Sequence, residues 1–135
     1  MRIIVDSNII ISAGLFPDSN IGKVLIHIVD NHNLVLCKYT LDELESVFIK
    51  KFPDKLQYFR IFINEFKFEL LDLEINDFTK YPQIRDVSDA PLLAYAIEGK
   101  TDILLTGDKD FENVLLVKPK IMTPRMYIDE IIKKT

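Results

Sequence analysis

The sequence is poor in several features that would have pointed to particular classes of protein. Cys37 is the only cysteine in 135 residues, which excludes an internal disulfide and a cysteine-based zinc site and suits a reducing compartment. Four glycines and six prolines beside 48% hydrophobic residues exclude a collagenous or low-complexity chain. No apolar run approaches the ~20 residues needed to span a membrane. The length instead predicts one globular domain, residues 1–135, with a sizeable core.

The chain also lacks an excess of positive charge. Seventeen Lys and Arg residues against 21 Asp and Glu residues give a formal net charge of −4. This balance argues against binding nucleic acid mainly through overall charge, so any such contact is expected from a local patch. Arg2 and the apolar residues after it imitate a secretory signal, but Asp6 and Asn8 interrupt the apolar stretch. We therefore expect the mature chain to begin at Met1 and to stay in the cytoplasm, away from membranes.

The apolar pattern predicts strands that alternate with helices. Short apolar or β-branched runs, typical of parallel strands buried on both faces, predict strands at residues 2–6, 34–37, 68–73, 102–106 and 114–117. Helical spacing and capping residues predict helices at about 8–15, 20–31, 41–51, 55–66, 89–98 and 124–131. The alternation indicates an α/β domain with a mainly parallel sheet.

Acidic residues gather where these elements meet one edge of the predicted sheet. In an open parallel sheet, ligands bind beyond the carboxyl ends of the strands. Asp6 and Asp108 follow two strands, Glu43 lies in the first turn of a helix that begins at the same edge, and Asp86 and Asp89 precede another helix. Crowded carboxylates repel one another unless protons or cations compensate them. Carboxylates suit Mg²⁺ or Mn²⁺, and two such ions about 4 Å apart can activate water and stabilise an in-line phosphoryl displacement.

Each acid also has a purely structural interpretation. Thr40 and Glu43 have the spacing of a capping box, in which Glu43 would only bond back to the start of its own helix. Asp89 can serve as an N-cap alone, and Asp108 can be an ordinary turn residue. Asp6 is harder to explain in this way, because an acid directly after Ile-Ile-Val needs a partner.

Four motifs together resemble the PIN-domain nucleases, and most closely the small VapC-like toxins of toxin–antitoxin pairs. The motifs are Val5-Asp6-Ser7-Asn8, Leu41-Asp42-Glu43-Leu44, Arg85-Asp86-Val87-Ser88-Asp89-Ala90 and Leu105-Thr106-Gly107-Asp108-Lys109-Asp110-Phe111, and Ile121-Met122-Thr123-Pro124-Arg125 is similar to the end of the family's chains. Each motif is weak alone, but in this order they cover nearly the whole chain. The resemblance implies a three-layer α/β/α fold with a central, mainly parallel sheet, and a ribonuclease that depends on Mg²⁺ or Mn²⁺.

Carried over residue by residue, the resemblance assigns roles to the acids. It places Asp6, Glu43, Asp89 and Asp108 at the family's catalytic and metal-binding positions. Glu45 is the competing helix acid, but it points about 200° away from Glu43 around a helix. The supporting residues implied by the motifs are Asn8, Asp86, Thr106 and Asp110.

The resemblance also implies a substrate and partners. RNA is the implied substrate, with Arg85 and Lys109 as the nearest candidates for phosphate contacts. A cognate antitoxin is implied because an uncontrolled ribonuclease would harm its host, and members of the family commonly form homodimers. An aspartate-nucleophile phosphotransferase is disfavoured, since it needs a second acid where Asn8 stands. The alternative hypothesis is a PIN-like module that binds RNA or protein without cutting.

Overall fold

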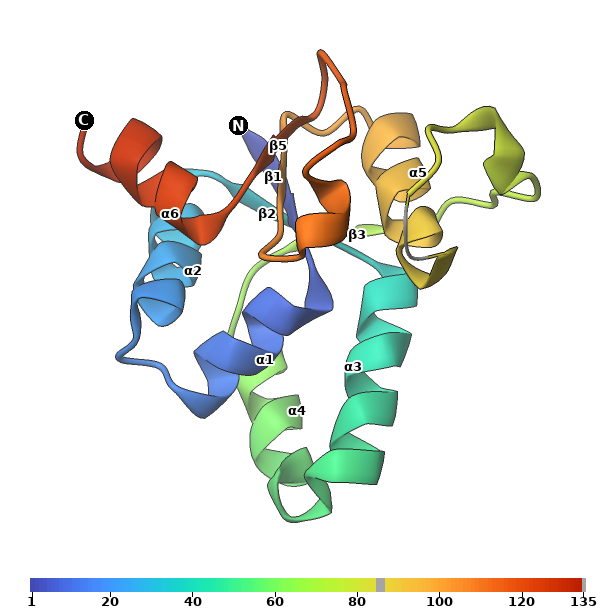
Figure 1. Ribbon diagram of the computed structural model, residues 1–135. Coiled ribbons are helices and arrows are strands. Elements are labelled where there is room, and N and C mark those ends of the chain that lie inside the picture. Colours follow the sequence, from blue (N-terminus) through green and yellow to red (C-terminus); the bar gives the residue numbers. More distant parts are fainter. Residues whose placement is uncertain (85–86, 135) are drawn as a thin grey trace.

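A five-stranded parallel sheet forms the middle of the molecule (Figure 1). The structure is a computed structural model that describes residues 1–84 and 87–134. In chain order the strands are β1 (Arg2–Val5), β2 (Asn33–Cys37), β3 (Glu69–Leu71), β4 (Ile103–Leu105) and β5 (Lys120–Met122). Their spatial order is β3-β2-β1-β4-β5, so the chain builds outward from β1 in one direction and then in the other. The order reverses between β1 and β4, and such a switch point is where doubly wound folds bind ligands.

Helices cover both faces of this sheet. They are α1 (Ser7–Leu15), α2 (Asn20–Asn31), α3 (Lys38–Lys51), α4 (Leu56–Asn64), α5 (Ala90–Glu98) and α6 (Pro124–Tyr127), with a π-helix, η5 (Ile128–Ile132), after α6. Four short 3-10 turns complete the described elements: η1 (Pro53–Lys55), η2 (Phe78–Lys80), η3 (Val87–Asp89) and η4 (Lys109–Phe111). Figure 1 shows α3 and α4 as a hairpin that extends away from the sheet.

Alternation along the strands gives the molecule two cores. Ile3 and Val5 of β1 pack in a cluster with residues of α1, α2, α3, α4 and α6. Ile4 of the same strand points the other way and packs with Leu104 and with Leu93 of α5. Parallel strands buried on both faces read as continuous apolar runs, which is why the strands could be found in the sequence. The arrangement confirms the predicted three-layer α/β/α fold.

The predicted fifth strand is wrong. Residues 114–117 lie in a loop in which Leu115 is 91% and Val117 100% exposed, and β5 begins only at Lys120. A strand parallel to β4 must start at the amino edge of the sheet, so the chain first has to return from the carboxyl edge where β4 ends. The apolar run 114–117 falls within this return, and Met122 rather than Val117 enters the core.

Helix α3 begins earlier than the sequence predicted. Its N-cap is Cys37, the last residue of β2, so the strand passes into the helix without a loop. Thr40 lies inside the first turn, where its hydroxyl contacts Cys37 Sγ at 3.1 Å. The capping box between Thr40 and Glu43 is therefore absent. Helix α4 has no side-chain cap either, because its N-cap residue is Lys55.

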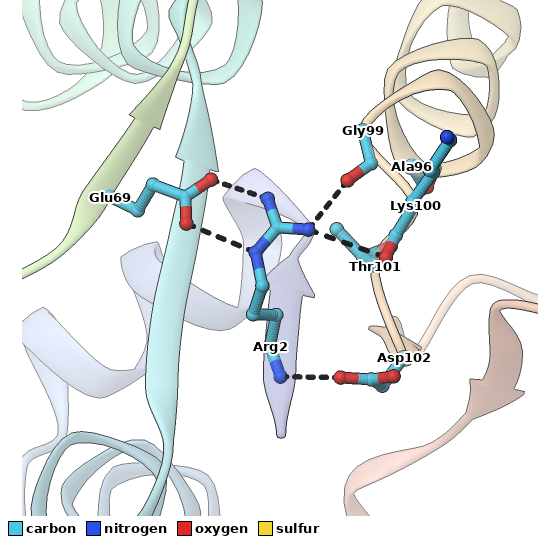
Figure 2. A network of polar contacts seen from close by, with 7 residues as sticks. All are labelled: Arg2, Glu69, Ala96, Gly99, Lys100, Thr101 and Asp102. Atoms are coloured by element: carbon cyan, nitrogen blue, oxygen red, sulfur yellow. Dashed lines mark hydrogen bonds and ion pairs between the residues drawn. The ribbon is translucent and has the colours of Figure 1, made fainter.

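Ion pairs and hydrogen bonds close the amino edge of the sheet (Figure 2). The Arg2 guanidinium reaches past β2 and forms a two-pronged pair with Glu69 of β3, one prong measuring 3.0 Å. It also donates to the Gly99 carbonyl at 2.6 Å, at the end of α5, while the Arg2 backbone amide donates to Asp102 at 2.7 Å. Arg2 thus joins β1, β3, α5 and the residue before β4.

Within residues 1–84 and 87–134, no single helix is long and apolar enough to cross a membrane. The bent pair α1 and α2 meets that test by length and composition only when both are taken together, with an angle of 111° between them. Both helices contribute buried residues to the first of the two cores, Ile10 and Leu25 among them.

Candidate functional site

Asp6 stands at the switch point of the sheet, directly after β1. Its backbone amide donates to Leu105 O at 3.0 Å, which places it beside the end of β4, and its side chain caps α1 by accepting from the Asn8 amide at 3.4 Å. The Thr106 hydroxyl donates to Asp6 Oδ2 at 2.7 Å. Burial raises the pKa of the Asp6 carboxyl and the charge of Glu43 adds to this, while hydrogen bonds from Thr106, Asn8 and Ser7 act in the opposite direction.

Ser7 brings Asp6 and Glu43 together. Its hydroxyl donates to Glu43 Oε1 and lies 3.3 Å from Asp6 Oδ1. Glu43 therefore faces α1 and Asp6 instead of bonding back to the start of its own helix. Glu45 lies on another side of α3, where it pairs with Arg60. Of the two helix acids, Glu43 therefore lies beside Asp6 and Glu45 does not; the role of Glu43 as a metal ligand stays a prediction.

A second group of carboxylates lies at the same edge. Asp89, Asp108 and Asp110 each offer an oxygen atom, and these three atoms lie within 4.8 Å of one another. Asp108 caps η4 by accepting from the Asp110 amide at 2.9 Å, and Asp89 ends η3 with its Oδ2 atom buried. Carboxylate oxygens at this spacing are the hard donors that Mg²⁺ and Mn²⁺ prefer, so the residues fit a divalent cation.

Two side chains connect the groups. Thr106 donates to Asp6 and accepts from the Asp108 amide at 3.1 Å, so it joins the two strands at the switch point. Tyr39 of α3 donates to the Ser88 carbonyl of η3 at 2.9 Å. Burial, the charge of Glu43, a hydrogen bond with Glu43 and then the charge of Asp89 raise the pKa of Tyr39 to about 12.

The remaining predicted residues lie around these groups or outside the described residues. Asn8 is exposed, and its backbone amide is what contacts Asp6. Lys109 is exposed in η4, between Asp108 and Asp110. Arg85 and Asp86 fall outside the described residues.

Sequence reasoning missed Ser7 and Tyr39. Ser7 stood within a quoted motif, and its place directly after Asp6 was the available signal. Tyr39 lies four residues before Glu43, and residues at that spacing share one face of a helix. That signal would have required the start of α3 to be placed correctly.

The chain is thus an α/β/α protein with a parallel sheet and two groups of acids at the carboxyl edge of that sheet. The chain belongs to the PIN domain family, whose sequence model matches residues 2–110. An uncharacterized protein of Methanocaldococcus jannaschii is 29% identical over 148 residues, covering 98% of this chain and 93% of that protein.

A likeness to a solved structure supports the same fold. A chain in the crystal structure of VapBC2 from Rickettsia felis, bound to a DNA fragment from their promoter, aligns with a TM-score of 0.71 and 17% identity. The alignment covers 91% of this chain and 98% of that one. At this identity the likeness is one of fold.

Proposed function

We propose that the protein is a divalent-metal-dependent endoribonuclease, the VapC-like toxin of a toxin–antitoxin pair. The observation that carries this proposal is that two groups of acids lie at one edge of the sheet of a PIN domain: Asp6 beside Glu43, and Asp89, Asp108 and Asp110 with oxygen atoms within 4.8 Å of one another. Acids buried or half-buried together are costly unless something positive compensates them. A cation at this edge would supply that compensation.

In this proposal Asp6, Glu43, Asp89 and Asp108 hold Mg²⁺ or Mn²⁺. When bound, such an ion lowers the pKa of water and stabilises charge on the phosphate oxygens of an in-line displacement. Ser7 and Thr106 fix the rotamers of the acids that they contact, so that the oxygens are in place before a cation arrives. Because the pKa of Asp6 is raised, cation binding has to displace any proton that Asp6 still carries, and affinity should fall as the pH is lowered.

The remaining acids are assigned to supporting roles in the site, and two basic residues are assigned to the substrate. Asp110 completes the second group of acids and orients water, with Asp86 as a further supporting acid. Lys109, exposed beside Asp108, contacts a phosphate of the RNA, and Arg85 is proposed for the same role. These assignments rest on the family resemblance and on the position of η4.

We further propose an antitoxin as partner, a homodimer as the assembly and the cytoplasm as the location. The similar structure from Rickettsia felis is of VapBC2 with promoter DNA, which supports the antitoxin proposal. A small gene that overlaps the start of the gene for this protein would support it further. Size measurement in solution tests the dimer.

Cleavage of structured RNA in the presence and absence of metal tests the central proposal. We expect cutting with Mg²⁺ or Mn²⁺ and none with EDTA, together with saturable Mn²⁺ binding in calorimetry. Cutting that persists in EDTA would overturn the metal mechanism. An absence of both cutting and saturable binding would instead favour the module that binds without cutting.

A further inference from the structure

Glu43 and Asp89, which belong to different groups of carboxylates, lie on secondary-structure elements of different stability. Glu43 lies in α3, a helix of 14 residues that buries Leu44 and Phe48 in the core. Asp89 lies at the end of η3, a 3-10 turn of three residues. Short 3-10 turns have weaker internal hydrogen bonds than α-helices, so the position of Asp89 depends on what holds the turn.

Tyr39 reaches this turn from α3. Its hydroxyl donates to the Ser88 carbonyl at 2.9 Å, across 49 residues of chain, and Ser88 directly precedes Asp89. Tyr39 also stands one helical turn before Glu43, on the same face of α3. The Tyr39 side chain therefore links η3, which contains Asp89, to α3, which contains Glu43, through a hydrogen bond.

The ring and the hydroxyl of Tyr39 do different things. The ring packs against the core formed by Ile4, Leu104 and α5, as any aromatic ring could at that position. The hydroxyl makes the contact with η3, and it also interacts with Glu43 of its own helix, so the amide exchange of η3 is the measurement that isolates the first contact. Thr106 does not duplicate this contact, because it joins Asp6 to Asp108 at the ends of β1 and β4.

We propose that Tyr39 is a positioning residue of the carboxylate site, whose hydroxyl holds Asp89 at the distance from Glu43 that a shared cation site requires. The inference rests on the proposed metal-dependent function and assigns to Tyr39 no contact with RNA. It predicts that removing the hydroxyl alone weakens cation binding while the ring keeps the fold intact.

The test compares Tyr39→Phe with Tyr58→Phe in the full chain. Tyr58 is a matched control, because its hydroxyl also donates to a backbone carbonyl, that of Gly14, at 3.1 Å and between α4 and α1. For Tyr39→Phe we expect the dissociation constant for Mn²⁺ to rise about fivefold in calorimetry, the factor that one ordinary hydrogen bond is worth. Tyr58→Phe should leave it unchanged, and both variants should melt at similar temperatures without metal.

Cleavage kinetics and amide exchange complete the test. Tyr39→Phe should lower kcat at limiting Mn²⁺, and kcat should return to the wild-type value at saturating Mn²⁺. The KM for RNA should not change. In the metal-free protein, the amides of residues 88–90 and 92–94 should exchange faster in Tyr39→Phe than in the wild type or in Tyr58→Phe.

The outcomes separate this inference from the proposed function. Wild-type Mn²⁺ affinity in Tyr39→Phe, or an equal loss in Tyr58→Phe, would overturn the role of Tyr39 in cation binding. If the wild type neither binds Mn²⁺ nor cuts RNA, the proposed function fails, and amide exchange still decides whether the hydroxyl fastens η3. Unchanged exchange in Tyr39→Phe overturns the fastening itself.

Discussion

The pKa values of acids at the two edges of the sheet are shifted in opposite directions. At the amino edge, Glu69 and Asp102 contact Arg2, and hydrogen bonds from Arg2 hold the pKa of each carboxyl below its ordinary value (Figure 2). At the carboxyl edge, Asp6 is buried and faces Glu43, and its pKa is raised. At one end of the sheet, the Arg2 guanidinium stabilises Glu69 and the Arg2 backbone amide stabilises Asp102, whereas at the other end Asp6 lies beside a second acid.

Under the proposed function, this difference separates acids that stabilise the fold from acids that bind a cation. A carboxylate paired with an arginine contributes to stability and gains little from a metal ion. A buried carboxylate beside a second one costs stability, and it persists in a sequence where it serves another purpose. Substitutions at each edge test this contrast.

The largest effect is expected for Asp6→Asn. The variant keeps the size of the side chain but removes a charge from the centre of the site, so RNA cleavage with Mn²⁺ should fall by about 10²-fold or more, as when one preorganised electrostatic group is lost. The melting temperature of the metal-free protein should stay equal or rise, because repulsion from Glu43 is relieved. Wild-type cleavage in this variant would remove Asp6 from the proposed mechanism.

Glu43→Gln should have the next largest effect. A neutral amide is a poorer ligand than a carboxylate for a hard cation, so Mn²⁺ affinity in calorimetry should fall by at least the roughly tenfold that losing an outer-shell partner costs. Glu45→Gln, on the same helix but paired with the exposed Arg60, is the control and should leave the affinity unchanged. Equal behaviour of the two variants would contradict the role given to Glu43.

Arg2→Met tests the amino edge and should act on stability alone. The variant loses the pair with Glu69 and the bond to Gly99, which should lower the free energy of unfolding by about 1–2 kcal/mol in urea titrations, discounted because the pair is partly exposed. Mn²⁺ affinity should not change. Arg125→Met, which removes an exposed pair with Asp129, should cost no more than about 0.5 kcal/mol.

The smallest effect is the pH dependence of stability, and its sign should differ between the edges. Asp6 keeps its proton to a higher pH in the folded chain than its ordinary pKa of 3.8, so its ionisation costs the folded state as pH rises above that value. In EDTA, the melting temperature of Asp6→Asn should therefore exceed that of the wild type by an amount that grows as the pH rises. Glu69 has a lowered pKa, so the melting temperature of Glu69→Gln should be below that of the wild type above pH 4.5. The difference should shrink as the pH falls. Parallel curves for the two variants would refute the contrast.

Much of the fold could be predicted because its strands are buried on both faces. Runs such as Ile3–Val5 and Leu34–Cys37 carry that signal in themselves, and the acids that follow them could be placed at the carboxyl edge by topology alone. Cys37, at the end of one of these runs, is fully buried, and its burial raises the pKa of the thiol.

The errors came where distant parts of the chain decide local structure. The position of β5 depends on the return path from the end of β4, which no local pattern of residues 114–117 records. The start of α3 depends on its direct connection to β2, while Thr40 offered a locally plausible cap. Ser7 and Tyr39 gain their roles only through contacts with Glu43 and Ser88, which are 36 and 49 residues away.

The direct junction between β2 and α3 also limits how the gene can change in length. One residue inserted after Cys37 would turn α3 by about 100° relative to the sheet, and Tyr39 and Glu43 would leave the edge of Asp6 together. The loop between η4 and β5 has Leu115 and Val117 exposed. A change in its length would not rotate a helix relative to the sheet. Insertions and deletions in related genes should therefore accumulate in that loop and be absent from the junction.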